Sequence, residues 1–220
     1  MSDKKQQRYL AALHRIEEPL YPYDQVMVAI CHTQLGSYVL AQEHYLLATQ
    51  EFLQARRMWQ MAGCPHWPVE AYVLAGQPQP YARVYQEVSA YKLDRRRNAL
   101  VALYAYALLE LMAGNDSMAV EYVPGLLEYP KYKGMVAIGQ TIAAVVHREQ
   151  AEFDSALAAL LEAHRGMAQH GELRSTPEGF ISLAGMCLSK MALDRGLAVR
   201  LESEYLPKSY LAYLQGSKVH

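Results

Sequence analysis

The sequence has few cysteines and no excess of charge of either sign. Its 220 residues include three widely spaced cysteines, Cys31, Cys64 and Cys187. A disulfide framework or a cysteine-rich zinc site would need more cysteines or closer pairs, so we expect a reducing compartment. Lysine and arginine total 21 against 22 aspartates and glutamates, a formal net charge of −1. This balance argues against a nucleic-acid-binding protein and against an acidic mimic of DNA, because both need a one-sided electric field.

The sequence also lacks a long apolar run. Its most apolar window, residues 99–113, has 15 residues with one charge, Glu110. A membrane-spanning helix needs about 20 apolar residues, so this window predicts a buried central helix. The charged first residues have no apolar stretch behind them and do not fit a signal peptide. We therefore expect a cytoplasmic protein with no membrane partner.

Apolar residues make up 52% of the chain and recur with the period of a helix, whereas the alternation typical of strands is missing. The clearest stripe runs through residues 37–63. Small and aromatic side chains alternate along it in steps of four and three: Ala41, Tyr45, Ala48, Phe52, Ala55, Trp59 and Ala62. A neighbouring helix can approach at the alanines while the rings fill the gaps, which is typical of stacked helical hairpins.

Weaker stripes predict further helices at residues 6–20, 24–35, 69–75, 80–91, 99–113, 117–128, 135–147 and 153–170. A last long helix is expected to begin at Ser175, which has capping-box spacing to Glu178, and to end near Gly196. No linker divides the chain. The sequence therefore predicts one all-α domain over residues 1–220, with about ten helices packed as stacked hairpins and weakly tetratricopeptide-like.

The sequence contains no recognisable catalytic or metal-binding motif. It has no His-Glu-x-x-His, no phosphate-binding glycine loop and no Gly-x-Ser-x-Gly elbow. His164 lies on an apolar stripe and is interpreted as a packed or capping histidine. Cys64 and His66 flank Pro65 in a predicted turn. A structural role explains this composition more simply than a reactive thiol beside an imidazole does. We expect no catalytic residue, no metal and no cofactor, and therefore not an enzyme.

Tyrosine is unusually frequent, with 17 tyrosines against three phenylalanines. Tyrosine suits half-buried positions and protein-binding surfaces, because its hydroxyl needs a partner when it is buried. A basic run that includes Arg95 and Arg96 is a candidate for contact with an acidic partner. The predicted partner-binding residues are His66, Trp67, Tyr72, Tyr81, Tyr85, Arg95, Arg96, Tyr129 and Tyr132. The alternatives are that the tyrosines bridge helix ends within the fold and that the basic run is solvated surface.

The C-terminal part of the chain resembles the immunity protein 49 family. The resemblance rests on residues 176–183 (TPEGFISL), 191–199 (MALDRGLAV) and 202–207 (ESEYLP), and on the upstream segments 153–157 and 162–164. It covers residues 94–211 and is strongest from 176 to 207. Members of this family are antidotes of bacterial polymorphic-toxin systems. The resemblance implies no catalysis, cytoplasmic residence and one cognate toxin domain as partner.

Two functions are therefore compared. The first is an immunity protein that neutralises a secreted toxin domain by covering it, with contacts expected in the front half of the chain. The second is a helical-repeat scaffold or peptide-binding adaptor without a toxin partner, which the weak repetition and the aromatic residues allow. The sequence leaves open the toxin's identity and chemistry, its delivery and the oligomeric state of this chain.

Overall fold

The computed structural model of the chain describes residues 22–41, 44–61, 69–75 and 99–216, and every regular element in these ranges is a helix. The α-helices are α2 (Pro22–Ala41), α3 (Tyr45–Met61), α4 (Val69–Leu74), α6 (Ala99–Ala113), α7 (Asp116–Glu121), α8 (Val123–Leu127), α9 (Lys133–His147), α10 (Gln150–His170), α11 (Leu183–Asp194) and α12 (Lys208–Leu214). Two short 3-10 helices, η1 (Glu172–Ser175) and η2 (Pro177–Phe180), lie between α10 and α11. The predicted all-α class is confirmed for these residues, whereas tetratricopeptide-like stacking stays a prediction.

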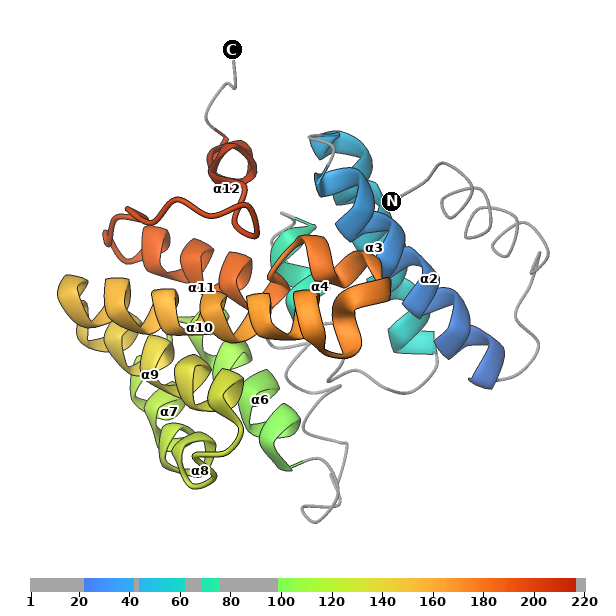
Figure 1. Cartoon of the computed structure of the whole chain (residues 1–220). Coiled ribbons are helices and arrows are strands. Elements are labelled where there is room, and N and C mark those ends of the chain that lie inside the picture. Colours follow the sequence, from blue (N-terminus) through green and yellow to red (C-terminus); the bar gives the residue numbers. More distant parts are fainter. Residues whose placement is uncertain (1–21, 42–43, 62–68, 76–98, 217–220) are drawn as a thin grey trace.

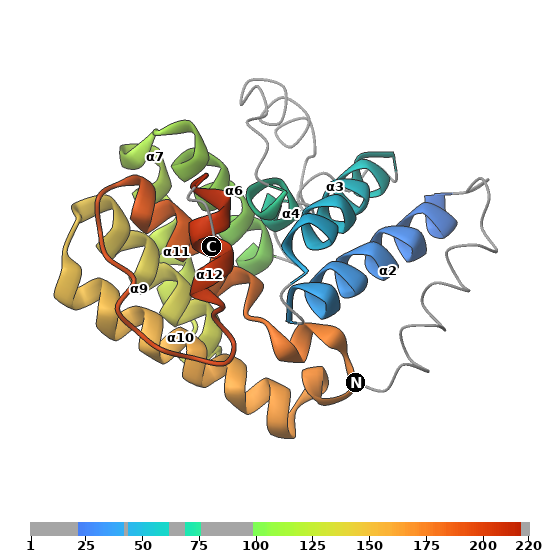
Figure 2. The same cartoon turned by 90° about the horizontal axis from the view of Figure 1, so that it is seen from above.

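Two pairs of neighbouring helices stand on either side of the molecule. Helices α2 and α3 pack along each other, and α9 packs along α10 with only Arg148 and Glu149 between them. In Figure 2 the α2–α3 pair lies on one side and the α9–α10 pair on the other, with α4, α6 and α11 between them. Helix α12 lies at the end of the molecule opposite α7 and α8 (Figure 1). Helices α4, α6 and α11 therefore form the middle of the described structure.

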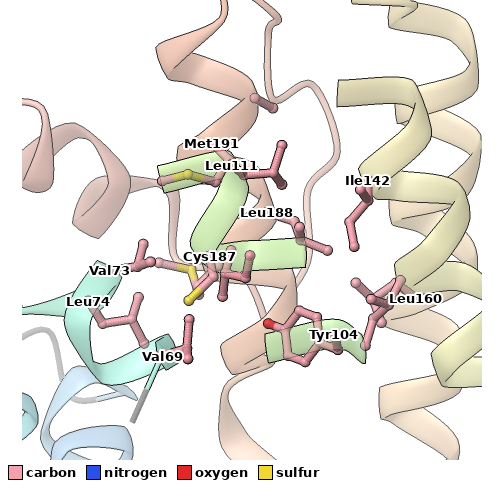
Figure 3. Close-up of a cluster of buried hydrophobic side chains, with 14 of the residues drawn as sticks. Val69, Val73, Leu74, Tyr104, Leu111, Ile142, Leu160, Cys187, Leu188 and Met191 are labelled. Carbon is pink, nitrogen blue, oxygen red and sulfur yellow. The ribbon is translucent and has the colours of Figure 1, made fainter. Parts of the chain in front are cut away.

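The core is centred on α11. Figure 3 shows where its side chains meet those of α4, α6, α9 and α10; the labelled residues are Val69, Val73, Leu74, Tyr104, Leu111, Ile142, Leu160, Cys187, Leu188 and Met191. Cys187 and Leu188 are fully buried. Burial raises the pKa of the Cys187 thiol well above its ordinary value, so this cysteine is a small core residue, as its sequence context predicts.

The apolar window at residues 99–113 is helix α6, as predicted. Its Leu108 and Leu109 are fully buried, and even Glu110 is 2% exposed. The carboxylate of Glu110 accepts a hydrogen bond of 2.9 Å from Asn115 Nδ2 just beyond the helix end. None of the helices in the described ranges is both long and apolar enough to cross a bilayer.

The prediction of one helix over residues 37–63 is wrong at its start. Residues 37–41 belong to α2, and α3 begins at Tyr45. The His44 amide donates to the Val39 carbonyl at 3.0 Å, which closes α2 and turns the chain. The step of four from Ala41 to Tyr45 keeps the helical spacing across this break, so the period alone does not reveal it. Within α3 the stripe residues Ala48, Phe52 and Ala55 are fully buried, as expected, and a Cβ on Gly36 would lie 3.0 Å from the Phe52 ring.

The candidate helix at residues 117–128 is two short helices, α7 and α8. Pro124 lies in the first turn of α8. Because proline has no amide hydrogen, it is tolerated where a helix begins and interrupts one that continues.

The predicted start of the last long helix at Ser175 is also wrong. Residues 172–180 form η1 and η2, and α11 begins only at Leu183. Its N-cap is Ser182, whose Oγ accepts a hydrogen bond of 3.2 Å from the Gly185 amide. The Ser182 amide in turn donates to the carbonyl of Tyr205 at 2.9 Å, which holds this point of the chain extended. A contact with a segment 23 residues away along the sequence therefore sets where the helix begins.

The end of α11 lies where the sequence predicts it. Gly196 has a φ of +84°, the left-handed conformation that ends many helices. Next to it, Arg195 Nη2 donates to Asp116 Oδ1 at 2.5 Å and to the Leu111 carbonyl at 2.7 Å. The guanidinium thus fastens the end of α11 to the turn between α6 and α7.

Candidate partner-binding surface

A cleft of about 1150 Å³ lies beside helices α9 and α10. Its walls are residues 130–138 at the start of α9, the second half of α10, and residues 171–184. We call it the α9–α10 cleft. Two smaller hollows measure about 350 and 220 Å³. A cleft of this size accommodates several side chains of another molecule.

The local sequence explains why the cleft forms. Helix α10 has 21 residues and α9 has 15, so the end of α10 extends past the start of α9. After the cap at Gly171, η1 and η2 fold the chain back towards the core. A Cβ on Gly179 would lie 2.5 Å from the Leu173 carbonyl oxygen, so glycine permits this close return. The returning segment forms a wall, and the cleft lies between it and the start of α9.

Two polar side chains that line the cleft have buried atoms without a hydrogen-bond partner, His164 Nε2 and Glu178 Oε2. His164 is 6% exposed and its ring meets that of Tyr205 edge-on, with centroids 5.0 Å apart. Burial lowers the pKa of His164, although a hydrogen bond with the Gly179 backbone acts in the opposite direction. The packed histidine predicted from the apolar stripe is therefore confirmed, and it also lines the cleft.

The rim of the cleft at the start of α9 is aromatic and basic. Tyr129 and Tyr132 are 43% and 49% exposed, and their ring centroids lie 6.5 Å apart in an edge-to-face arrangement. Lys131 Nζ lies 5.0 Å from the centre of the Tyr132 ring, which is a cation–π contact. Met167 of α10 is also exposed and lines the same cleft.

The structure brings together two of the predicted partner-binding residues, Tyr129 and Tyr132. The backbone of Tyr72 lies in α4, and its side chain is not described. The other predicted residues lie outside the described ranges: His66, Trp67, Tyr81, Tyr85, Arg95 and Arg96. Their place in a binding surface stays a prediction.

Sequence reasoning missed Met167, Lys131 and Lys133. Met167 continues the apolar stripe of Phe153, Leu157 and Leu160 and was expected in the core, yet it lies where α10 has passed the start of α9. The exposure of Met167 could be predicted only by noticing that its apolar stripe is longer than the helix it packs against. That comparison requires knowing that α9 and α10 pair.

A second polar cluster lies inside the fold. The Tyr104 hydroxyl donates to Glu70 Oε1 at 2.9 Å, and the Cys187 thiol lies 3.6 Å from the Glu70 carbonyl oxygen. Burial raises the pKa of Glu70, and the hydrogen bond from Tyr104 partly opposes this shift. Within the described ranges, no group of three or more His, Cys, Asp or Glu side chains is placed to hold a metal ion. The cluster joins α4, α6 and α11, which is a structural role.

In the described ranges the chain is all-helical and carries exposed aromatic side chains beside a cleft. The model of the immunity protein 49 family matches residues 69–210, and the chain belongs to this family. The match includes every segment that carries the sequence resemblance and extends further towards the N-terminus. Membership implies an immunity protein of a polymorphic-toxin system with a cognate toxin as partner, and such proteins are generally non-catalytic antidotes. The comparisons with curated proteins and with solved structures gave no match.

Proposed function

We propose that this chain neutralises one cognate secreted toxin domain by binding it directly and covering its active site. The single observation that carries the proposal is membership of the immunity protein 49 family over residues 69–210. In this function the chain performs no chemistry and acts in the cytoplasm of the cell that makes it. The exposed Tyr129 and Tyr132 support the proposal, because tyrosines at the centre of an interface often contribute much of the binding energy.

Co-expression with the toxin domain encoded next to this gene tests the proposal. Cells that make the toxin domain alone should stop growing, and cells that also make this chain should grow. The two purified proteins should form a stoichiometric complex in size-exclusion chromatography. Continued toxicity, or separate elution of the two proteins, would reject this pairing as the function.

The predicted contacts in the front half of the chain belong to the same proposal. A variant with Trp67→Ala, Tyr81→Ala and Tyr85→Ala together should lose rescue while keeping its helical circular dichroism. If rescue survives all three changes, the contacts lie elsewhere.

The α9–α10 cleft favours one alternative, a peptide-binding adaptor built from repeat-like helical hairpins. Its volume and its exposed Met167 suit a short peptide. An adaptor would bind short peptides with modest affinity and would not rescue cells from the toxin domain. The co-expression experiment therefore separates the two functions.

A further inference from the structure

Helix α9 begins without the negative charge that helix N-termini usually attract. Its N-cap, Tyr132, makes no side-chain hydrogen bond to the helix, and its first turn contains no aspartate or glutamate. Lys131 and Lys133 flank the cap instead. A helix N-terminus carries a partial positive charge, so these lysines add to a field that is already positive. No carboxylate of a described residue lies within ion-pair distance of either ammonium group.

The same rim carries an unusual share of exposed apolar surface. The described residues include nine large apolar or aromatic side chains that are exposed, and three of them belong to this rim: Tyr129, Tyr132 and Met167. Tyr132 and Met167 line the α9–α10 cleft itself. A positive pole thus lies at the mouth of an apolar cleft.

An independent observation also points to a molecule that completes the cleft. Buried polar atoms in folded proteins nearly always have a hydrogen-bond partner. His164 is 6% exposed and lines the cleft, yet its Nε2 has no partner, and the same holds for Glu178 Oε2 in the opposite wall. Both atoms can therefore form a hydrogen bond with a polar group of a molecule that enters the cleft.

We propose that the toxin places an acidic side chain at the N-terminus of α9, between Lys131 and Lys133, and an adjacent bulky apolar side chain in the α9–α10 cleft beside Met167. This inference rests on the proposed function, because the partner is the cognate toxin. The lysines and the amides of the first turn of α9 give the carboxylate charge-assisted hydrogen bonds. Tyr129 and Tyr132 pack against the apolar part of the segment.

The apolar cleft favours a polypeptide over a nucleic acid. A phosphate group would suit the positive pole, but a nucleic acid would leave the apolar walls without a matching surface. Competition by a short single-stranded DNA oligonucleotide tests this point. The oligonucleotide should leave the complex intact, and displacement of the toxin from the wild-type chain by the oligonucleotide would overturn the proposal.

The main test measures the dissociation constant for the adjacent-gene toxin domain, inactivated at its own catalytic residue. The double variant Lys131→Glu/Lys133→Glu should bind about 30-fold or more weakly, as expected when a charge pair in an interface is reversed. A matched control is Arg148→Glu/Arg200→Glu, which changes the net charge equally at exposed sites outside the cleft. The control should bind like the wild-type chain. Equal binding by both double variants would overturn the proposal.

Loss of folding does not explain the expected result. Lys131 and Lys133 are exposed, and a glutamate in the first turn of α9 interacts favourably with the helix dipole. The thermal midpoint of the variant should therefore equal or exceed that of the wild-type chain. Met167→Asp tests the apolar half separately and should weaken binding about 10-fold or more. Wild-type affinity in Met167→Asp would contradict the placement of the apolar side chain.

Two further readouts identify the toxin segment. A photo-crosslinking phenylalanine introduced at Tyr132 should attach to a toxin peptide that contains aspartate or glutamate, and one introduced at Arg148 should not attach. Changing that acidic residue to lysine in the toxin should restore binding to Lys131→Glu/Lys133→Glu. If the wild-type chain binds and neutralises the toxin but neither result appears, this inference fails while the proposed function stands. If the wild-type chain does not bind the toxin, the proposed function fails first.

Discussion

The tyrosines show how the same residue type serves two roles in this chain. Tyr129 and Tyr132 are exposed, as expected for a binding surface, whereas Tyr104, Tyr205 and Tyr210 are buried. The hydroxyls of Tyr104 and Tyr210 are hydrogen-bonded inside the fold. Composition allowed both roles, because it does not distinguish a tyrosine partner in the core from one across an interface.

Tyr210 provides a direct test of the buried role. Its hydroxyl donates to the Leu74 carbonyl at 2.5 Å and lies 3.2 Å from Thr49 Oγ1. Tyr210→Phe leaves the Leu74 carbonyl without this donor, so the free energy of unfolding should fall by about 1–2 kcal/mol. Urea denaturation measures the change. Tyr213→Phe, in the half-buried ring stacked on Tyr210, is the comparison and should lose less; an equal loss would contradict this account.

Glu70 should make stability depend on pH in a direction opposite to that of most carboxylates. Burial raises its pKa in the folded state, with the Tyr104 hydrogen bond as a smaller opposing effect. A raised pKa stabilises the fold while the carboxyl is protonated, below its unfolded value, and this contribution is lost as pH rises through the folded value. Glu70→Gln keeps an acceptor for Tyr104 and removes the charge. The variant should be more stable than wild type at pH 7, and the difference should shrink near pH 4.

Unfolding curves at the two pH values measure this difference. His164 is a second titrating group, but its lowered pKa acts in the other direction, destabilising the fold as pH falls below its unfolded value. Because His164 is present in both proteins, the comparison of Glu70→Gln with wild type cancels its effect. A variant that is less stable than wild type at pH 7 would show that the carboxylate is well accommodated.

At the scale of the helices, local signals predicted several ends and missed long-range ones. The ends at Gly171 and Gly196 follow from glycine alone. The 3-10 turns and the start of α11 depend on the hydrogen bond from the Ser182 amide to Tyr205, which sequence spacing does not reveal. The candidate site could likewise be predicted only in part. The abundance of tyrosine pointed to Tyr129 and Tyr132, whereas the α9–α10 cleft is formed by three separate segments whose arrangement the sequence does not reveal.

The cap of α11 can be tested against the capping pattern seen in the sequence. Ser182→Ala removes the acceptor of the Gly185 amide and should lower the free energy of unfolding by about 1 kcal/mol. Ser175→Ala, at the serine of the capping pattern, should have a smaller effect because Ser175 lies at the end of η1. Chemical denaturation of the two variants ranks them. If Ser175→Ala lowers the free energy of unfolding more than Ser182→Ala does, the helix begins at Ser175, as the sequence predicts.

At the scale of the whole molecule, α4, α11 and η2 connect the two helix pairs. Helix α4 contacts α3 on one side and α6 and α11 on the other, and η2 contacts both α2 and α10. Buried side chains continue across these contacts, as Figure 3 shows for α4, α6 and α11. Within the described ranges these contacts form one continuous core, and one domain over residues 1–220 stays a prediction.

One domain should unfold in one cooperative step, and the chain carries a convenient probe. Both tryptophans, Trp59 and Trp67, lie in the front half of the sequence, so their fluorescence reports on that half alone. Among the described helices, those from Ala99 onward contain more residues than those before it, so they contribute more to the far-ultraviolet circular dichroism. Because the core is shared, Ile142→Val in α9 should lower both thermal midpoints together, by about 2–4 °C for each kcal/mol lost. Two separate midpoints, or a shift in circular dichroism without one in fluorescence, would show that the front half folds as a unit of its own.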